Sequence, residues 1–304
     1  MLTAVVFPGQ GSQTVGMGAD LANMPVSVLF ERANSVLGYS LSEIMLNGPE
    51  ETLRLTENAQ PALLTHSFAL WSLIRDKVNP SFFAGHSLGE YTALAAAGCI
   101  TFEDAVKMVH NRGRFMQDAV PVGVGGMMAV IGATDTEVET VCQEVSAPGA
   151  VVEPANYNAD GQIVVAGHNA ALASFAAVMK ERYAKRSISL PVSAPFHCSL
   201  MEPAQNRMAN YISGVEFLPP LTPVVNNIDA RIENEVTRIK GALVRQITGA
   251  VRWTQAVRTL ISLGVTTFIE VGAGAVLSGL IKKIDRNISC VNISMFEDIT
   301  KVNG

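Results

Sequence analysis

Apolar runs that suit buried strands alternate along this chain with segments whose apolar residues recur at helical spacing. We predict strands at 3–7 and 81–84, each of which leads into a glycine-containing turn. Helices are predicted at 58–77, at 88–97 and from Thr101 to about Ala119. Later in the chain we predict helices near 199–213, 235–247 and 253–263, and a strand at 266–271. This alternation predicts an α/β fold built on a parallel sheet.

The pattern changes near Gly123, where shorter elements follow one another closely. We predict strands at 126–132, 150–157, 162–167 and 186–190, and helices at 135–146 and 170–182. The resulting order, βαββαβ, is that of ferredoxin-like domains. We therefore expect a small ferredoxin-like domain of residues 125–192, inserted into a larger α/β hydrolase-like domain made of residues 1–124 and 193–304.

Composition and charge exclude several classes of protein. Of the 304 residues 48% are hydrophobic and 16% are charged, which excludes an intrinsically disordered chain. The net charge of −5 argues against a nucleic-acid partner, because phosphate contacts need a basic face. Four widely spaced cysteines without a CxxC pair argue against a metal site and favour reduced thiols.

The sequence shows no segment that suits a membrane or a secretory leader. No window approaches the roughly 18 uncharged apolar residues of a membrane-spanning helix. No lysine or arginine precedes Arg32, so the charged start of a signal peptide is missing. We expect a cytoplasmic protein with no membrane partner.

The segment Gly85-His86-Ser87-Leu88-Gly89 matches the GxSxG pattern between a predicted strand and a predicted helix. In that setting a sharp turn exposes the serine, and the N–H groups that open the helix face it. Ser87 is therefore a candidate nucleophile, and the Leu88 N–H is a candidate oxyanion donor. The alternative is a tight turn with a purely structural role.

A serine nucleophile needs a general base, and we favour His197. It follows Pro195-Phe196, a rigid, extended segment that suits the placement of an imidazole ring. The residues alone leave the choice open among the five histidines, of which the others are His66, His86, His110 and His168.

Six segments, taken together, resemble the malonyl-CoA:acyl-carrier-protein transacylase family. In the family's order they are Phe7-Pro8-Gly9-Gln10-Gly11-Ser12-Gln13, Asn58-Ala59-Gln60-Pro61-Ala62-Leu63, Gly85-His86-Ser87-Leu88-Gly89-Glu90-Tyr91, Arg112-Gly113, Pro195-Phe196-His197 and Glu270-Val271-Gly272. They cover nearly the whole chain, whose length is similar to that of the free-standing enzyme of dissociated fatty-acid synthesis. The resemblance implies transfer of a malonyl group from coenzyme A to the phosphopantetheine thiol of an acyl carrier protein. It implies an acyl-serine intermediate and no cofactor besides the coenzyme A thioester, and we expect a monomer.

The resemblance also implies roles for the residues of the reaction centre. Ser87 attacks the thioester and His197 takes its proton, while a backbone carbonyl orients the imidazole. Gln10 helps to form the oxyanion hole with the Leu88 N–H. Without the resemblance, Gln10 is more simply interpreted as an amide that caps its own turn.

Three further residues match positions that contact the acyl group in the family. Arg112 matches the arginine that pairs with the malonyl carboxylate, which its planar fork can grip with two hydrogen bonds. Gln60 matches a glutamine that lines the site. Phe196 matches a position where phenylalanine accompanies malonyl and serine accompanies methylmalonyl. Each residue has an alternative interpretation. Arg112 could be a surface arginine, Gln60 a cap at the start of its helix, and Phe196 a hydrophobic anchor for the loop.

The segment Thr248-Gly249-Ala250 departs from the family, which commonly has Asn-Pro there. A backbone carbonyl from this loop is expected to orient the histidine, and without proline the loop is less stiff. Three alternatives to the function stay open at this stage. They are a stand-alone acyltransferase that loads a polyketide synthase carrier, a serine acyl hydrolase and a non-catalytic scaffold.

Overall fold

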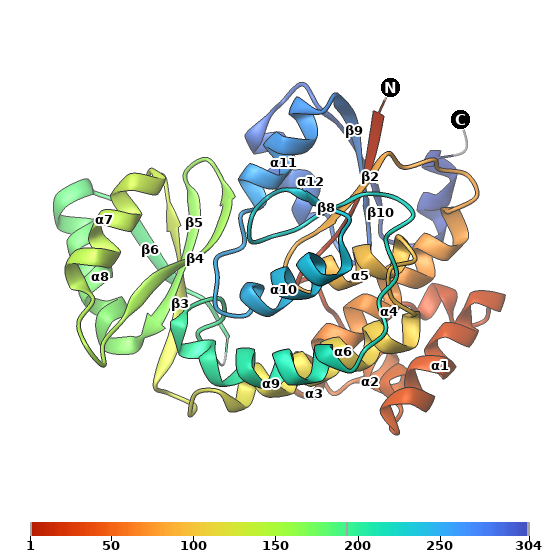
Figure 1. Cartoon of the computed structure of the whole chain (residues 1–304), viewed down its shortest axis with the longest axis horizontal. Coiled ribbons are helices and arrows are strands. Elements are labelled where there is room, and N and C mark those ends of the chain that lie inside the picture. The colour runs from red at the N-terminus through yellow and green to blue at the C-terminus, as the bar shows by residue number, and fades with distance from the viewer. Residues whose placement is uncertain (1, 193, 303–304) are drawn as a thin grey trace.

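A computed structural model describes residues 2–192 and 194–302, whose strands form two separate sheets (Figure 1). Ser193, where we expected the larger domain to resume, lies outside the described residues, as do residues 1, 303 and 304. The six-stranded sheet has the order β10-β9-β1-β2-β7-β8. Its strands are β1 (Leu2–Phe7), β2 (Phe82–Gly85), β7 (Val224–Val225), β8 (Ile232–Glu233), β9 (Val265–Val271) and β10 (Ser289–Ile293). All neighbours are parallel except β7 and β8, so the predicted α/β fold with a parallel sheet is confirmed.

Both faces of this sheet are buried, as the nearly continuous apolar runs of its strands require. In β1, Val5 and Phe7 belong to one hydrophobic cluster, whereas Ala4 and Val6 belong to another. Because successive side chains of a strand point to opposite faces, helices must cover the sheet on both sides. Those of the larger part are α1 (Val28–Leu37), α2 (Leu41–Asn47), α3 (Glu50–Arg54), α4 (Thr56–Ile74), α5 (Gly89–Ala96), α6 (Phe102–Asp118), α9 (Glu202–Ser213), α10 (Val236–Gln246), α11 (Trp253–Ser262) and α12 (Val276–Ile284).

The second sheet is antiparallel and has the order β4-β5-β3-β6. Its elements are β3 (Gly125–Ile131), α7 (Asp135–Val145), β4 (Val152–Ala159), β5 (Gln162–His168), α8 (Asn169–Tyr183) and β6 (Arg186–Ser189). Counted along this segment, the strand order is 2-3-1-4, which is the ferredoxin-like arrangement that the βαββαβ pattern predicts. Figure 1 shows these elements in green as a separate lobe. The domain bounds of 125–192 themselves stay a prediction.

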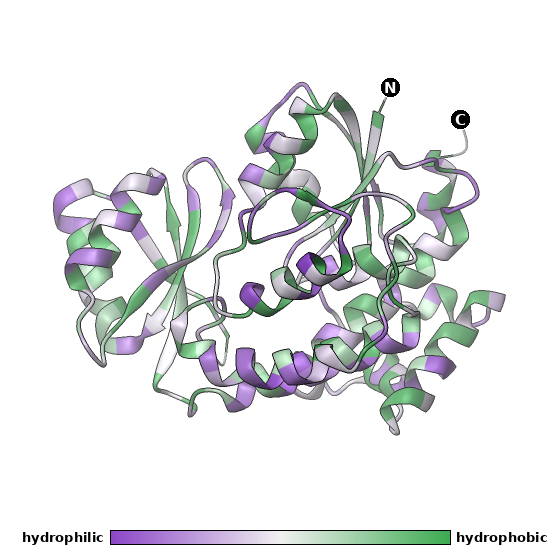
Figure 2. Ribbon diagram, viewed as in Figure 1, coloured by the Kyte–Doolittle hydropathy of each residue, from purple (hydrophilic) through white to green (hydrophobic). Residues whose placement is uncertain are grey.

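Several elements escaped the sequence analysis because they are short or lie away from any motif. They are the helices α1, α2 and α3 and the strands β7, β8 and β10. In β7 and β8 only two residues pair, which is too short for a periodic pattern to show. Most peripheral helices mix hydrophilic and hydrophobic residues, as burial of one side requires (Figure 2). Within the described residues, no helix combines the length and apolar character needed to cross a bilayer.

Candidate active site

Ser87 lies at the sharp turn between β2 and α5, at the carboxyl edge of the large sheet. Its φ of 53° is in the left-handed region, which L side chains rarely adopt. A Cβ on Gly85 would lie 2.0 Å from the Gly89 carbonyl carbon, and one on Gly89 would lie 2.2 Å from the Phe7 carbonyl oxygen. The turn therefore forms only with glycine at both positions, and the predicted strand–turn–helix setting of Ser87 is confirmed.

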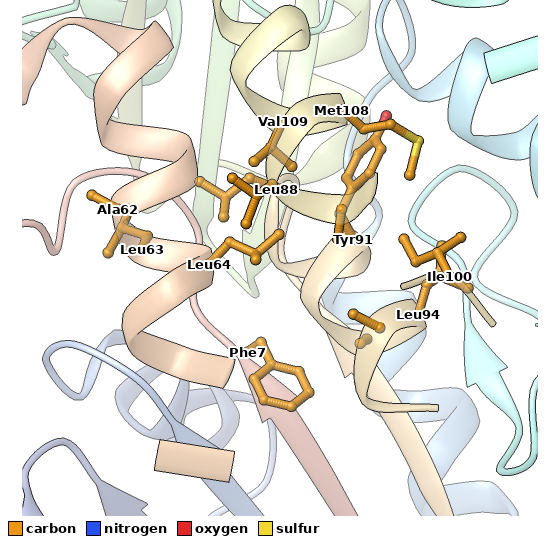
Figure 3. Packing of buried hydrophobic residues seen from close by; sticks show 14 of the residues in the cluster. Phe7, Ala62, Leu63, Leu64, Leu88, Tyr91, Leu94, Ile100, Met108 and Val109 are labelled. Carbon is orange, nitrogen blue, oxygen red and sulfur yellow. The ribbon is translucent and has the colours of Figure 1, made fainter. Parts of the chain in front are cut away.

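Helix α5 holds this turn in place because it is packed on both sides. Leu88, just before α5, and Tyr91 on α5 are buried, and Leu63 and Leu64 of α4 lie across from them (Figure 3). Met108 of α6 belongs to the same buried cluster. Burial of such side chains stabilises the folded state by roughly 1.5–3 kcal/mol each, which secures the helix that begins at the nucleophile.

The Ser87 hydroxyl meets the predicted base directly. Ser87 Oγ lies 2.8 Å from His197 Nε2, and His197 Nδ1 lies 2.8 Å from the Gln246 carbonyl oxygen. A carbonyl can only accept, so Nδ1 carries the proton and Nε2 is free to accept the serine proton. Burial, and next the Arg112 cation, lower the pKa of His197 to about 3. The imidazole is therefore neutral near pH 7 and able to act as a base.

The prediction placed the carbonyl that orients His197 in the Thr248-Gly249-Ala250 loop, but the carbonyl that accepts from Nδ1 belongs to Gln246, the last residue of α10. The backbone of Gly249, inside the loop, also raises the pKa of His197, but by less than the Gln246 carbonyl does. The loop has no proline, but backbone pairing with β4 restrains it. The Val251 N–H donates to the Ala155 carbonyl and the Tyr157 N–H donates to the Val251 carbonyl, both at 2.9 Å. The smaller lobe thus holds the residue that follows the loop.

Arg112 reaches the same point from α6 and is only 2% exposed. Its two terminal nitrogens donate to Gln60 Oε1 at 2.7 Å, to Ser87 Oγ at 2.9 Å and to Gln246 Oε1 at 2.9 Å. Within the described part of the chain, no acidic side chain forms an ion pair with it. A buried guanidinium without a carboxylate partner, next to a nucleophile, is suited to bind an anionic substrate group.

A cavity of about 600 Å³ opens over the dyad. Gln10, Gln60, Phe196 and Arg112 line it together with Ser87 and His197. The structure thus brings together all the side chains that the sequence analysis singled out. Leu88 contributes only its backbone, because its side chain is buried in the core.

The two glutamines of the cavity are linked through one hydroxyl. Thr56 Oγ1 donates to Gln10 Oε1 at 2.9 Å and accepts from Gln60 Nε2 at 3.0 Å. Gln60 is the fifth residue of α4, and its side-chain oxygen accepts from Arg112 and not from a backbone N–H of the first turn, so the alternative of a helix-start cap is not supported. Gln10 is held by Thr56 and makes no described side-chain bond within its own turn, so the turn-capping interpretation is not supported.

Three buried polar residues of the site were missed by the sequence analysis. Asn227 accepts the Ser87 N–H at 2.6 Å and donates to the Gly85 carbonyl at 2.6 Å, so it clamps both sides of the turn. Gln246 Nε2 donates to Glu90 Oε2 at 2.7 Å. No local pattern marks Asn227 or Gln246. Glu90 carried a signal, because it is the only charged residue in the predicted apolar helix 88–97.

Comparisons with known proteins identify the family of this chain. The acyl transferase domain family matches residues 4–293. A malonyl CoA-acyl carrier protein transacylase of Salmonella typhimurium is 48% identical over 285 residues, which cover 92% of each chain. The protein of that name from Haemophilus influenzae is 44% identical over 99% of this chain and 97% of its own.

Solved structures give the same picture. An acyl-carrier-protein S-malonyltransferase from Burkholderia pseudomallei 1710b superposes with a TM-score of 0.96 at 43% identity, and the match covers 100% of both chains. A malonyl-transacylase in complex with its holo type II PKS acyl carrier protein also gives a TM-score of 0.96 at 43% identity, over 99% of both chains.

Proposed function

The chain belongs to the acyl transferase domain family, and from this premise we infer that it transfers malonyl groups from coenzyme A to an acyl carrier protein. One observation carries the inference from acyl transfer to malonyl transfer. The buried Arg112 guanidinium lies 2.9 Å from the nucleophile Ser87, where a carboxylate on the bound acyl group needs a partner.

The first half-reaction loads the serine. Ser87 Oγ attacks the thioester carbonyl of malonyl-CoA while its proton passes to His197 Nε2, 2.8 Å away. The Leu88 N–H and Gln10 stabilise the resulting oxyanion. When the tetrahedral intermediate collapses, the C–S bond breaks and the coenzyme A thiol leaves with the proton from His197. The product is a malonyl ester on Ser87.

The second half-reaction runs the same chemistry in reverse. His197 takes the proton of the carrier's phosphopantetheine thiol, and the sulfur attacks the malonyl ester. Collapse of the second intermediate returns the proton to Ser87 Oγ and leaves malonyl on the carrier. Serine and histidine supply the nucleophile and the base, so the reaction needs no cofactor besides the coenzyme A thioester.

Arg112, Gln60 and Phe196 shape the acyl end of the cavity. Gln60 holds one arm of the guanidinium at 2.7 Å, which orients the fork toward the serine. Phe196 is 8% exposed and lines the cavity, where its ring limits the room at the α-carbon of the acyl group. The site therefore favours an acyl group that carries a carboxylate and no branch.

A polyketide carrier is the second candidate acceptor, because one structural relative was solved with a type II PKS carrier protein. Transfer of malonyl to carrier proteins of the two kinds, compared at equal concentration, distinguishes a fatty-acid role from a polyketide role. A cytoplasmic, monomeric protein without a nucleic-acid partner remains our expectation from the sequence.

Intact-mass analysis tests the proposed function. After incubation with malonyl-CoA, the protein should gain one malonyl group on Ser87, and addition of a holo carrier protein should move this group to the carrier. The Ser87→Ala variant should gain no stable mass. A stable adduct on that variant would contradict the assignment of the nucleophile, and release to water in place of transfer would indicate a hydrolase.

A further inference from the structure

A buried carboxylate lies one amide away from the buried cation of the site. Glu90 Oε2 accepts the Gln246 Nε2–H at 2.7 Å and the Asn227 backbone N–H at 3.0 Å. Gln246 Oε1 in turn accepts from Arg112 at 2.9 Å. The guanidinium, the amide and the carboxylate thus form a chain in which the two charges never touch.

The orientation of the Gln246 amide follows from its partners. Its nitrogen faces the Glu90 carboxylate and the Ser87 carbonyl, which can only accept, and its oxygen faces Arg112, which can only donate. The same residue orients His197 through its backbone carbonyl. Glu90 therefore holds the side chain of Gln246. This residue contacts Arg112 with its side chain and His197 with its backbone carbonyl.

The separation of the two charges has a chemical consequence. A carboxylate in direct contact with Arg112 would occupy the fork and compete with the substrate, whereas a buried cation with no negative charge nearby would be costly. With the amide between them, Glu90 offsets the cation, and no carboxylate of the described residues occupies the position on Arg112 that a substrate carboxylate needs. We propose that Glu90 is a positioning residue that acts on Arg112 through the Gln246 amide, so that its ionisation sets how tightly the site binds acyl groups that carry a carboxylate.

This inference rests on the proposed malonyl transfer. It predicts that the binding of malonyl-CoA is coupled to the protonation of Glu90. Burial raises the pKa of Glu90 to about 7. When a malonyl carboxylate binds Arg112, an ionised Glu90 repels it and a protonated Glu90 does not. Malonyl-CoA should therefore bind more weakly as the pH rises through this pKa, while acetyl-CoA, which has no carboxylate, should be indifferent to Glu90.

Other charged groups around Glu90 do not produce this pattern. Arg112 faces Glu90 from α6. Tyr91, which follows Glu90 on α5, has a pKa that burial raises to about 12. Asp229 follows β7 and pairs with the Arg245 guanidinium at 2.6 Å. The pKa of His197 is lowered to about 3. Titration of His197 or of the coenzyme A phosphates would affect both substrates alike.

The test compares Ser87 acylation by malonyl-CoA and by acetyl-CoA between pH 6 and 8.5, in the unmodified protein and in Glu90→Gln. Glutamine has the shape of the carboxylate, and its oxygen can accept both N–H groups. In the unmodified protein, the half-saturating malonyl-CoA concentration should rise about tenfold over this range, as expected for two buried charges of like sign. In Glu90→Gln that rise should vanish, and acetyl-CoA should show the same pH profile in both proteins.

Each other outcome contradicts the proposal in a distinguishable way. An unchanged malonyl-CoA profile in Glu90→Gln, or an equal change for both substrates, would show that the charge of Glu90 does not act on the substrate carboxylate. If the variant does not fold, the unmodified protein alone provides the test. The half-saturating concentration of malonyl-CoA is divided by that of acetyl-CoA at each pH, and a ratio that does not change with pH overturns the proposal. Absence of any malonyl adduct at every pH would overturn the proposed function itself, and this inference with it.

Discussion

Arg112 donates a hydrogen bond to the Ser87 hydroxyl at 2.9 Å, so the cation and the nucleophile meet at one oxygen atom. Because the guanidinium can only donate, the serine proton points elsewhere, and His197 Nε2 receives it at 2.8 Å. Arg112, which we propose selects the acyl group, therefore also helps to direct the Ser87 proton toward His197.

The turn that exposes Ser87 should not tolerate a methyl group at Gly89. A Cβ there would lie 2.2 Å from the Phe7 carbonyl oxygen, a backbone atom that cannot move aside. We expect Gly89→Ala to lower Ser87 acylation at least a hundredfold and to lower the Tm. The matched control is Gly279→Ala in α12, where a Cβ meets no atom within 4 Å. This control should raise stability by roughly 0.5–1 kcal/mol, and equal behaviour of the two variants in thermal unfolding would contradict the packing argument.

Asn227 should control the rate of acylation without controlling which acyl group is used. Asn227→Ala removes the side-chain partner of the Gly85 carbonyl and of the Ser87 N–H, and each buried polar group left unpaired costs roughly 1–3 kcal/mol. We expect kcat to fall for malonyl-CoA and acetyl-CoA by the same factor. The control is Asn226→Ala, a buried neighbour whose side chain instead accepts from the Asp229 N–H. A changed ratio between the two substrates in Asn227→Ala would argue against a clamp on the turn alone.

The pH profile of acylation should reflect the low pKa of His197. Because burial favours the neutral imidazole and lowers the pKa to about 3, the base form persists well below pH 6.5. With saturating acetyl-CoA, which avoids the substrate carboxylate, the acylation rate constant should stay nearly constant from pH 8 down to about pH 5.5. Stopped-flow or quenched-flow mass analysis measures this rate. A half-maximal rate near pH 6.5 would show a solvated imidazole instead.

Phe196 should limit branching at the α-carbon of the acyl group. Phe196→Ser removes a ring that lines the cavity, and one methyl group in such a pocket is worth roughly 1–3 kcal/mol. The ratio of kcat/KM for methylmalonyl-CoA to that for malonyl-CoA should therefore rise by about ten- to a hundredfold. Phe196→Leu keeps most of the bulk and should shift the ratio much less. If the ratio is the same in all three proteins, the ring only anchors the loop.

The turn around Ser87 could be predicted from sequence because its determinants are local. Gly85 and Gly89 flank the serine in the chain and are the residues whose Cβ atoms would collide. His197 lies 110 residues from Ser87 along the chain. The Pro195-Phe196 segment favours it among the five histidines, but the choice rests mainly on the resemblance to a family. The fold brings it to the serine, and no spacing rule encodes that contact.

Residues that act through long-range hydrogen bonds were beyond prediction. Asn227 follows a strand of two residues, and Gln246 ends an ordinary amphipathic helix, so neither lies in a recognisable motif. The backbone bonds that hold the chain just after the Thr248-Gly249-Ala250 loop escape prediction for the same reason. Their partners are Ala155 and Tyr157 on β4, almost a hundred residues earlier in the chain.

Arg112 is the residue on which the proposed recognition of the malonyl carboxylate most directly depends. The decisive measurement is kcat/KM for malonyl-CoA and acetyl-CoA in the unmodified protein, Arg112→Ala and Arg112→Lys. Loss of the partner of a buried carboxylate costs about 3–5 kcal/mol, so Arg112→Ala should lower the malonyl-CoA value by roughly a hundred- to a few-thousandfold. The acetyl-CoA value should fall far less, and Arg112→Lys should recover only part of the malonyl transfer, because an ammonium lacks the fork. An equal fall for both substrates in Arg112→Ala would show that Arg112 is structural and that the carboxylate is recognised elsewhere.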